Sequence, residues 1–177
     1  DIDTHFSIIT DTATLSIYDP ITIEKYNQQN DPSWWIDCLD VEEVQRGEMS
    51  LINLQADGHY TFRITSTVLT QSERLSAIAV INDLGVEISS GTLCISNGEA
   101  MQSSSDKESD NALIPRPNEK YSLSAYTLDS ENDKNPCCVL VLQPRDRRAI
   151  RTDTDIPERL VSSSWMKRVV YERDVLS

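Results

Sequence analysis

The 177-residue sequence has only two histidines, His5 and His59, and this scarcity limits the enzyme classes open to it. Any Ser-His or Cys-His nucleophile would have to use one of them. The chain also lacks a G-x-S-x-G elbow, a phosphate-binding loop, a dinucleotide fingerprint and an H-E-x-x-H motif. We therefore expect a protein that is not an enzyme and needs no cofactor; a hydrolase that uses two carboxylates, or His59 with a serine, is the minor alternative.

No apolar run approaches the roughly 18 residues that cross a bilayer, and the N-terminus lacks Met and a signal-peptide pattern. Four cysteines, at positions 38, 94, 137 and 138, include no C-x-x-C pair. Cys137 and Cys138 are adjacent, so on a strand they point to opposite faces and do not bond each other. Free thiols fit a reducing compartment, so we expect a cytoplasmic protein; a trimmed periplasmic or secreted form is the alternative.

Basic residues are few and unevenly placed. Residues 1–144 hold 8 Lys/Arg against 23 Asp/Glu (−15), and residues 145–177 hold 8 against 6 (+2), which together give the formal charge of −13. An acidic body repels nucleic acid and anionic membranes and attracts basic proteins at long range. We therefore expect a basic protein partner, and no nucleic-acid or membrane binding. The alternative is that the charge serves solubility alone.

Short alternating segments between turn signals predict a mainly β protein. Two strands are expected within residues 6–19, ended by Pro20, and others within 50–54, 60–65 and 75–81. "NDLG" at residues 82–85 is interpreted as a turn, and a hairpin follows over 85–98 with Ser90-Gly91 near its tip. Further strands are expected over 120–128 and 137–144. About seven or eight such strands are typical of an antiparallel β-sandwich.

One or two short helices are expected near residues 32–46. Asp31 is a suitable N-cap with Pro32 at the first helical position, and Gly47 stands where a helix would end. Two adjacent tryptophans cannot both face the core from one helix. This segment is therefore the predicted interaction patch, although a lid over one end of the sandwich is the alternative. The candidate residues are Trp34, Trp35, Asp37, Asp40, Glu42 and Glu43.

The stretch "LINLQADGHYTFRIT", residues 51–65, contains an Asp-Gly-His sequence inside alternating apolar residues. Asp-Gly between two such segments predicts a β-hairpin, because a primed turn needs positive φ values. If Tyr60, Phe62 and Ile64 face the core, His59, Thr61 and Arg63 face solvent. His59 is then a surface residue rather than a catalyst.

Residues 99–119 form a polar segment too long for an ordinary connection, which predicts a mobile or functional loop, and residues 129–136 form a second, acidic loop. Asp129, Glu131, Asp133 and Asn135 place oxygen atoms at alternate positions, as calcium sites do. The segment departs from the EF-hand pattern, because Lys134 replaces the glycine and Leu140 the final glutamate. A calcium-binding or other ligand-binding sandwich is thus the second hypothesis, with no metal site as the preferred reading.

The net charge changes from acidic to slightly basic after residue 144. We therefore expect a β-sandwich domain over residues 1–144 and a C-terminal extension over 145–177. The extension begins with the basic run "RDRRAIR" and continues with a segment that fits a helix or a strand. It could dock on the acidic body, cover a sheet edge or join two subunits of a homodimer. The sequence does not decide among these.

Several segments together carry a family resemblance: "TDTATLSIYDP", "WW", "GEMSLINLQADGHYTFRIT", "LGVEISSGTLCISNGEAM", "YSLSAYTLD" and "VLVLQPR". Over about residues 8–145 the chain resembles a bacterial family of small uncharacterised β-sandwich proteins. It is similar in layout to the nuclease inhibitor of the bacterial competence system. The resemblance implies a compact antiparallel domain with no catalytic residues to transfer. By analogy it implies a protein that binds and blocks another, as an immunity protein neutralises a toxin; the tail departs from the pattern.

Overall fold

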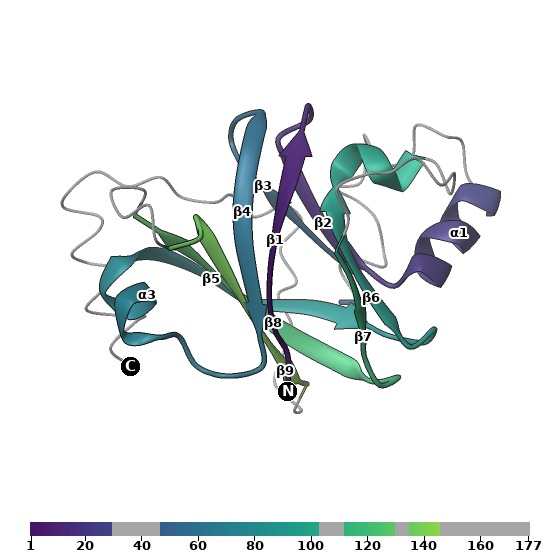
Figure 1. Ribbon diagram of the computed structural model, residues 1–177. Helices are drawn as coiled ribbons and strands as arrows, with labels where there is room; N and C mark the ends of the chain where they lie inside the picture. Colours follow the sequence, from purple (N-terminus) through teal and green to yellow (C-terminus); the bar gives the residue numbers. More distant parts are fainter. Residues whose placement is uncertain (30–46, 103–111, 130–134, 146–177) are drawn as a thin grey trace.

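The computed structural model describes residues 1–29, 47–102, 112–129 and 135–145, which form two β-sheets (Figure 1). Paired strands are antiparallel, except that β4 and β9 are parallel. In spatial order, the five-stranded sheet holds β1 (Asp3–Thr10), β4 (Gly58–Thr65), β9 (Cys138–Pro144), β8 (Lys120–Leu128) and β5 (Ala77–Glu87). The four-stranded sheet holds β3 (Ser50–Asn53), β2 (Thr14–Tyr18), β6 (Thr92–Asn97) and β7 (Ala112–Pro115).

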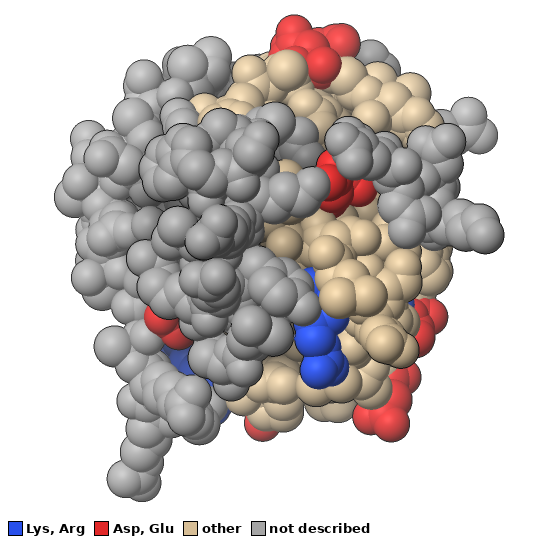
Figure 2. Space-filling model, turned by 90° about the vertical axis from the view of Figure 1, so that its left-hand side faces the viewer, with Lys and Arg blue, Asp and Glu red and all other residues tan. Residues whose placement is uncertain are grey.

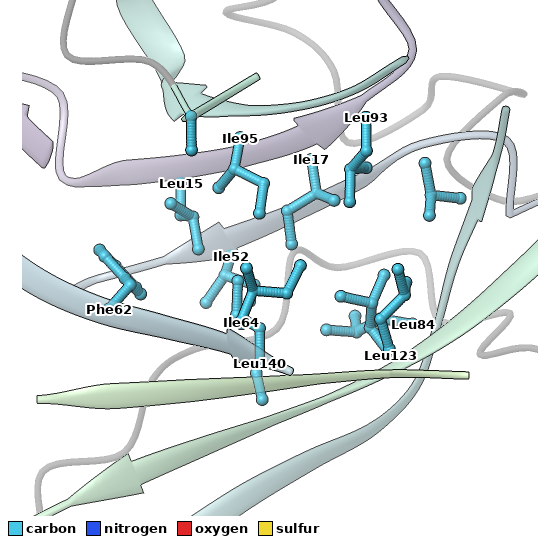
Figure 3. Packing of buried hydrophobic residues seen from close by; sticks show 14 of the residues in the cluster. Leu15, Ile17, Ile52, Phe62, Ile64, Leu84, Leu93, Ile95, Leu123 and Leu140 are labelled. Carbon is cyan, nitrogen blue, oxygen red and sulfur yellow. The ribbon is translucent and has the colours of Figure 1, made fainter. Parts of the chain in front are cut away.

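The predicted mainly β, sandwich-like fold is confirmed, with nine strands among the described residues. The main core lies between the sheets, where side chains from both layers point toward one another (Figure 3). Ile17 and Ile95 from the four-stranded sheet and Ile64 from the other are all 0% exposed. Burying one such side chain contributes about 1.5–3 kcal/mol, so this interior is the main source of stability.

A helix that the sequence did not predict follows β2. Helix α1 (Pro20–Gln29) begins where Pro20 was expected only to end a strand. Asp19 is its N-cap: a carboxylate oxygen of Asp19 accepts the N–H of Ile21 at 2.8 Å, and Pro20 takes the first helical position. The described residues form two further helices, α3 (Gln71–Ser76) and the 3-10 turn η2 (Gly98–Gln102). The helices predicted near residues 32–46 lie outside the described residues.

Two predicted hairpins are wrong, although their turn residues are correctly identified. Asp57-Gly58 joins β3 to β4, but β3 pairs with β2 while β4 pairs with β1 and β9. Ser90-Gly91 likewise joins β5 to β6, which belong to different sheets. Gly58 and Gly91 have φ values of 149° and 78°, which explains why glycine is used there. Local turn chemistry thus predicted a chain reversal but not which sheet the next strand joins.

The predicted turn at residues 82–85 is also wrong, because β5 continues through it. The β5–β8 register shifts between Ile81 and Leu84, and Asp83 has a φ of 62°. These features describe a β-bulge, which admits extra residues without ending the strand. β5 also begins at Ala77 rather than Leu75, since Leu75 belongs to α3.

Strand β7 lies inside the segment predicted as a long polar loop, and it is an edge strand. The Arg116 N–H donates to the Gly91 carbonyl on the β6 side. Because bonding direction alternates along an antiparallel strand, Pro115 faces the open edge. Proline has no N–H to offer there, so this edge is poorly suited to pairing with another strand.

Gly85 in β5 packs closely against the backbone at Gly47, and we expect Gly85→Ala to destabilise the fold. An added Cβ would lie 2.6 Å from Arg145 Nη2 and 2.7 Å from the Gly47 carbonyl oxygen. The second contact is with backbone, so relief requires a strand to move. We expect a loss of about 1–3 kcal/mol in the free energy of unfolding, measured by urea titration. An unchanged urea midpoint would show that Gly85 and Gly47 pack less tightly than these contacts require.

The free state of the cysteines is confirmed for the three that are described: Cys94, Cys137 and Cys138. Cys38 lies outside the described residues. So does the C-terminal extension beyond Arg145, so the division into domain and extension, and the homodimer through it, stay predictions. Among the described residues, no helix is long and apolar enough to cross a membrane.

Candidate protein-binding surface

The predicted interaction patch lies outside the described residues, as do two of the three candidate metal ligands, Glu131 and Asp133. Asp129 is described, and its backbone N–H donates to the Ser76 carbonyl at the end of α3. Asn135, at the far end of the same acidic segment, accepts from Ser72 Oγ at 3.1 Å and donates to Ser76 Oγ at 3.0 Å. Both ends of the segment are therefore held by α3, and the Asn135 side chain binds protein rather than presenting its oxygen to a cation.

Metal and thiol chemistry have little support in the described part of the chain. No group of three or more His, Cys, Asp and Glu residues there could hold a metal ion. Cys94 is buried, and burial raises the pKa of its thiol, which disfavours the reactive thiolate. Burial likewise raises the pKa of the neighbouring Tyr18, whose hydroxyl lies 3.1 Å from Ser96 Oγ. This cluster on the outer side of the four-stranded sheet is a hydrogen-bonded packing contact.

Of the three side chains predicted to face solvent from β4, His59 and Thr61 are exposed but Arg63 is buried. Arg63 does point away from the main core, but α3 covers it there. Its Nη1 donates to Glu73 Oε2 on α3 at 2.6 Å, and its Nε donates to Asp3 Oδ1 on β1 at 2.7 Å. The hydrogen bond from Arg63 holds the pKa of the Asp3 carboxyl below its usual value. Alternation predicted the face correctly but could not predict the helix over it.

No helix or strand of the described residues covers the remaining outer surface of β1 and the first half of β4, and we call this surface the β1–β4 face. The two strands stand side by side in Figure 1. Its outward residues are all exposed: His5, Ser7, Ile9, His59 and Thr61. Ile9 pairs directly with His59 across the strands and is 54% exposed, which is unusual for so large an apolar side chain in a sheet.

Acidic side chains stand at one end of this face. Thr10 and Gly58 are the last pair of the β1–β4 ladder, so Asp11 and Asp57 follow it on the two strands. Both residues are exposed. Glu99 from η2 fixes the turn between β1 and β2, because its carboxylate accepts hydrogen bonds from the Asp11 N–H and from Thr10 Oγ1. Ile9 is thus two residues from Asp11 along the chain, and its cross-strand partner His59 is two residues from Asp57.

The signal that could have revealed this face was the pair Ile8-Ile9. On one strand, adjacent residues face opposite ways, so two isoleucines cannot both enter the same core. The structure buries Ile8 completely and exposes Ile9. Sequence reasoning placed the candidate patch at the adjacent tryptophans by the same logic and did not apply it here.

The described surface as a whole is acidic. Seven Asp and Glu side chains are exposed there, against three Lys and Arg. The acidic ones are Asp1, Asp3, Asp11, Glu24, Asp57, Asp83 and Glu119, and the basic ones are Lys25, Arg74 and Lys120. Figure 2, seen from the side on which α3 lies, shows acidic groups at several separate places and sparse basic groups on the described part. The excess of acidic over basic residues in the sequence is therefore also present on the described surface.

Comparison with family models decides the relationship of the chain. A model for a family of unknown function, DUF6386, matches residues 2–142. The chain belongs to the DUF6386 family. The predicted membership of an uncharacterised β-sandwich family is thereby confirmed. No curated protein matches the sequence.

Two solved structures share the layout of this DUF6386 protein. One is titled "Crocagin biosynthetic gene J", with 14% identity and a TM-score of 0.53, covering 82% of this chain and 100% of that one. The other is ComJ, inhibitor of the DNA-degrading activity of NucA from Bacillus subtilis, with 11% identity and a TM-score of 0.46. It covers 82% of this chain and 96% of ComJ. The competence-system inhibitor, to which the sequence was expected to be similar in layout, is thus among the matching structures. The likeness to the first structure, at 14% identity, shows the fold alone.

Proposed function

We propose that this protein is a non-enzymatic binding module that neutralises a basic protein partner, such as a toxin or effector. The observation that carries the proposal is the charge imbalance, −15 over residues 1–144, together with its presence on the described surface. Opposite charges accelerate encounter and orient the partners before contact. A module of this kind acts by occupying the partner's functional surface, so it requires rigidity and complementarity rather than catalytic groups.

The disposition of the described basic side chains supports this proposal. Arg63 is buried and paired with two carboxylates, and Lys120 lies 3.4 Å from Glu87. Arg145 is half-buried and donates to the Gly47 carbonyl. The cations that the described residues carry are thus largely engaged within the molecule, while carboxylates face solvent. The free thiols support a cytoplasmic setting, which stays part of the proposal.

The test is capture of partners from the native host on the full-length protein, followed by elution with increasing salt. We expect a basic protein that elutes at raised ionic strength and loses its own activity when the purified complex forms. A matched bait should carry exposed acids changed to amides, Asp1→Asn, Asp57→Asn and Asp83→Asn, and should retain less of the partner. Partners that are acidic, that resist salt, or that stay fully active in the complex would contradict the proposal.

A further inference from the structure

We propose that the partner docks on the β1–β4 face and places a lysine or arginine side chain over Ile9, with its charged end toward Asp11 or Asp57. This assignment rests on the proposed function and gives it a location and a contact chemistry. It uses three observations: an uncovered sheet face, an exposed isoleucine within it, and carboxylates beside that isoleucine.

The face is uncovered only over part of its length, which limits where a partner can lie. Helix α3 covers β4 at Arg63, which its Glu73 contacts, and Arg63 and the next outward residue, Thr65, are both buried. Toward the other end of the ladder, Ser7, Ile9, His59 and Thr61 are all exposed. The backbone edge of β1 is not open at this point, since Asn97 Nδ2 donates to the Ile9 carbonyl at 2.8 Å. The partner therefore meets side chains on the face rather than adding a strand at the edge.

Charge complementarity selects the occupant. Neither the Asp11 nor the Asp57 carboxylate has a partner among the described residues, and Arg63, on the same face, is already neutralised by Asp3 and Glu73. Long basic side chains lay their methylene stems on apolar surface and extend the charged end to water or to an acid. Ile9 provides the apolar surface and the two carboxylates receive the cation, so an arginine or lysine satisfies both.

Two other exposed apolar residues lack this combination. Leu113, 63% exposed, belongs to β7, whose edge is closed to pairing by Pro115. Leu75, 64% exposed, follows the exposed cation Arg74 on α3, which would repel a basic partner. Leu113 therefore serves as the apolar control.

The test uses the partner that the capture experiment identifies, purified and titrated by calorimetry against the full-length protein and its variants. Ile9→Thr keeps a β-branched residue on the strand, and Asp11→Asn with Asp57→Asn removes the charges. The matched controls are Leu113→Thr and the pair Glu24→Gln with Glu119→Gln. We expect Kd to rise about tenfold or more for each β1–β4 variant and to change less than about twofold for the controls. Thermal unfolding confirms that every variant is folded.

Three outcomes contradict the assignment, and they differ in what else they exclude. If a salt-sensitive basic partner binds the Ile9 and Asp11/Asp57 variants with unchanged Kd, docking occurs elsewhere while the proposed function stands. If no basic partner binds in a salt-sensitive way, the proposed function fails and the docking assignment fails with it. A drop in affinity confined to the Asp11/Asp57 pair, with Ile9→Thr unchanged, rules out the stem-over-isoleucine contact.

Discussion

Replacing Arg63 with methionine is expected to lower the free energy of unfolding by about 3–5 kcal/mol, because it leaves the Glu73 carboxylate buried without its cation. The side chains of Arg63 and Glu73 are 6% and 4% exposed, and their ion pair measures 2.6 Å. Glu73 Oε2 also accepts the Thr70 N–H at 2.8 Å, so it cannot turn out to solvent without losing the helix cap. Equilibrium urea unfolding measures the loss.

A double variant distinguishes the loss of the Arg63–Glu73 ion pair from the cost of a buried Glu73 carboxylate without its cation. Arg63→Met with Glu73→Gln removes both charges, while the glutamine can still accept the Thr70 N–H. We expect this double variant to recover most of the stability lost in Arg63→Met alone, since a buried ion pair replaced by neutral groups is often nearly neutral. A double variant as unstable as the single one would mean that packing of the arginine stem, rather than charge compensation, holds α3 on the sheet.

Replacing Asp19 with alanine is expected to lower the free energy of unfolding by a similar amount, about 3–5 kcal/mol, because it leaves three backbone N–H groups without their shared buried acceptor. Asp19 is 0% exposed, and its carboxylate accepts from Ile21 at 2.8 Å, Ser89 at 2.6 Å and Ser90 at 2.7 Å. One side chain therefore starts α1 and fixes the turn between β5 and β6. Thermal and urea unfolding of the variant measure the effect.

Asp19→Ser distinguishes the two roles of this residue. Serine is a good N-cap and can still accept from Ile21, but its shorter side chain does not reach Ser89 and Ser90. We expect a loss between those of wild type and Asp19→Ala. If serine and alanine are equally destabilising, the cap contributes little and the turn contacts account for the whole effect.

The sequence predicted the class of fold well because strand alternation depends only on which face of a strand enters the core. Tyr60, Phe62 and Ile64 were assigned to the interior from their period of two, and all three are buried. Pairing was harder to predict. Asp57-Gly58 and Ser90-Gly91 reverse the chain as expected, yet each sends it to the opposite sheet, a choice fixed by distant partners such as β1 and β9.

Helix α1 was missed although its signal was recognised elsewhere. Asp31-Pro32 was interpreted as an N-cap with proline at the first helical position, whereas the same dipeptide at Asp19-Pro20 was interpreted only as a strand end. The segment after Pro20 has little amphipathic pattern and buries only Ile23, so periodicity gave no support. A tertiary contact that the sequence does not reveal also holds the start of the helix, because the Asp19 carboxylate accepts a hydrogen bond from Ser89, 70 positions away.

The candidate surface was hard to predict for a related reason. Whether an outward residue on β4 is exposed to solvent depends on α3, which contacts Arg63 through Glu73 and leaves Thr61 exposed. Alternation treats these two residues alike. The exposed Ile9 could have been suspected from its neighbour Ile8, but its position beside Asp57 depends on the β1–β4 register.

The central claim, that acidic charge steers a basic partner onto this protein, is tested most directly by the association rate constant of the purified partner at increasing ionic strength. The Debye length shortens from about 30 Å at 0.01 M to about 3 Å at 1 M, so a steered encounter slows over this range. We expect the association rate to fall by at least about tenfold while the dissociation rate changes much less. An association rate that is flat or rises with salt would contradict the account.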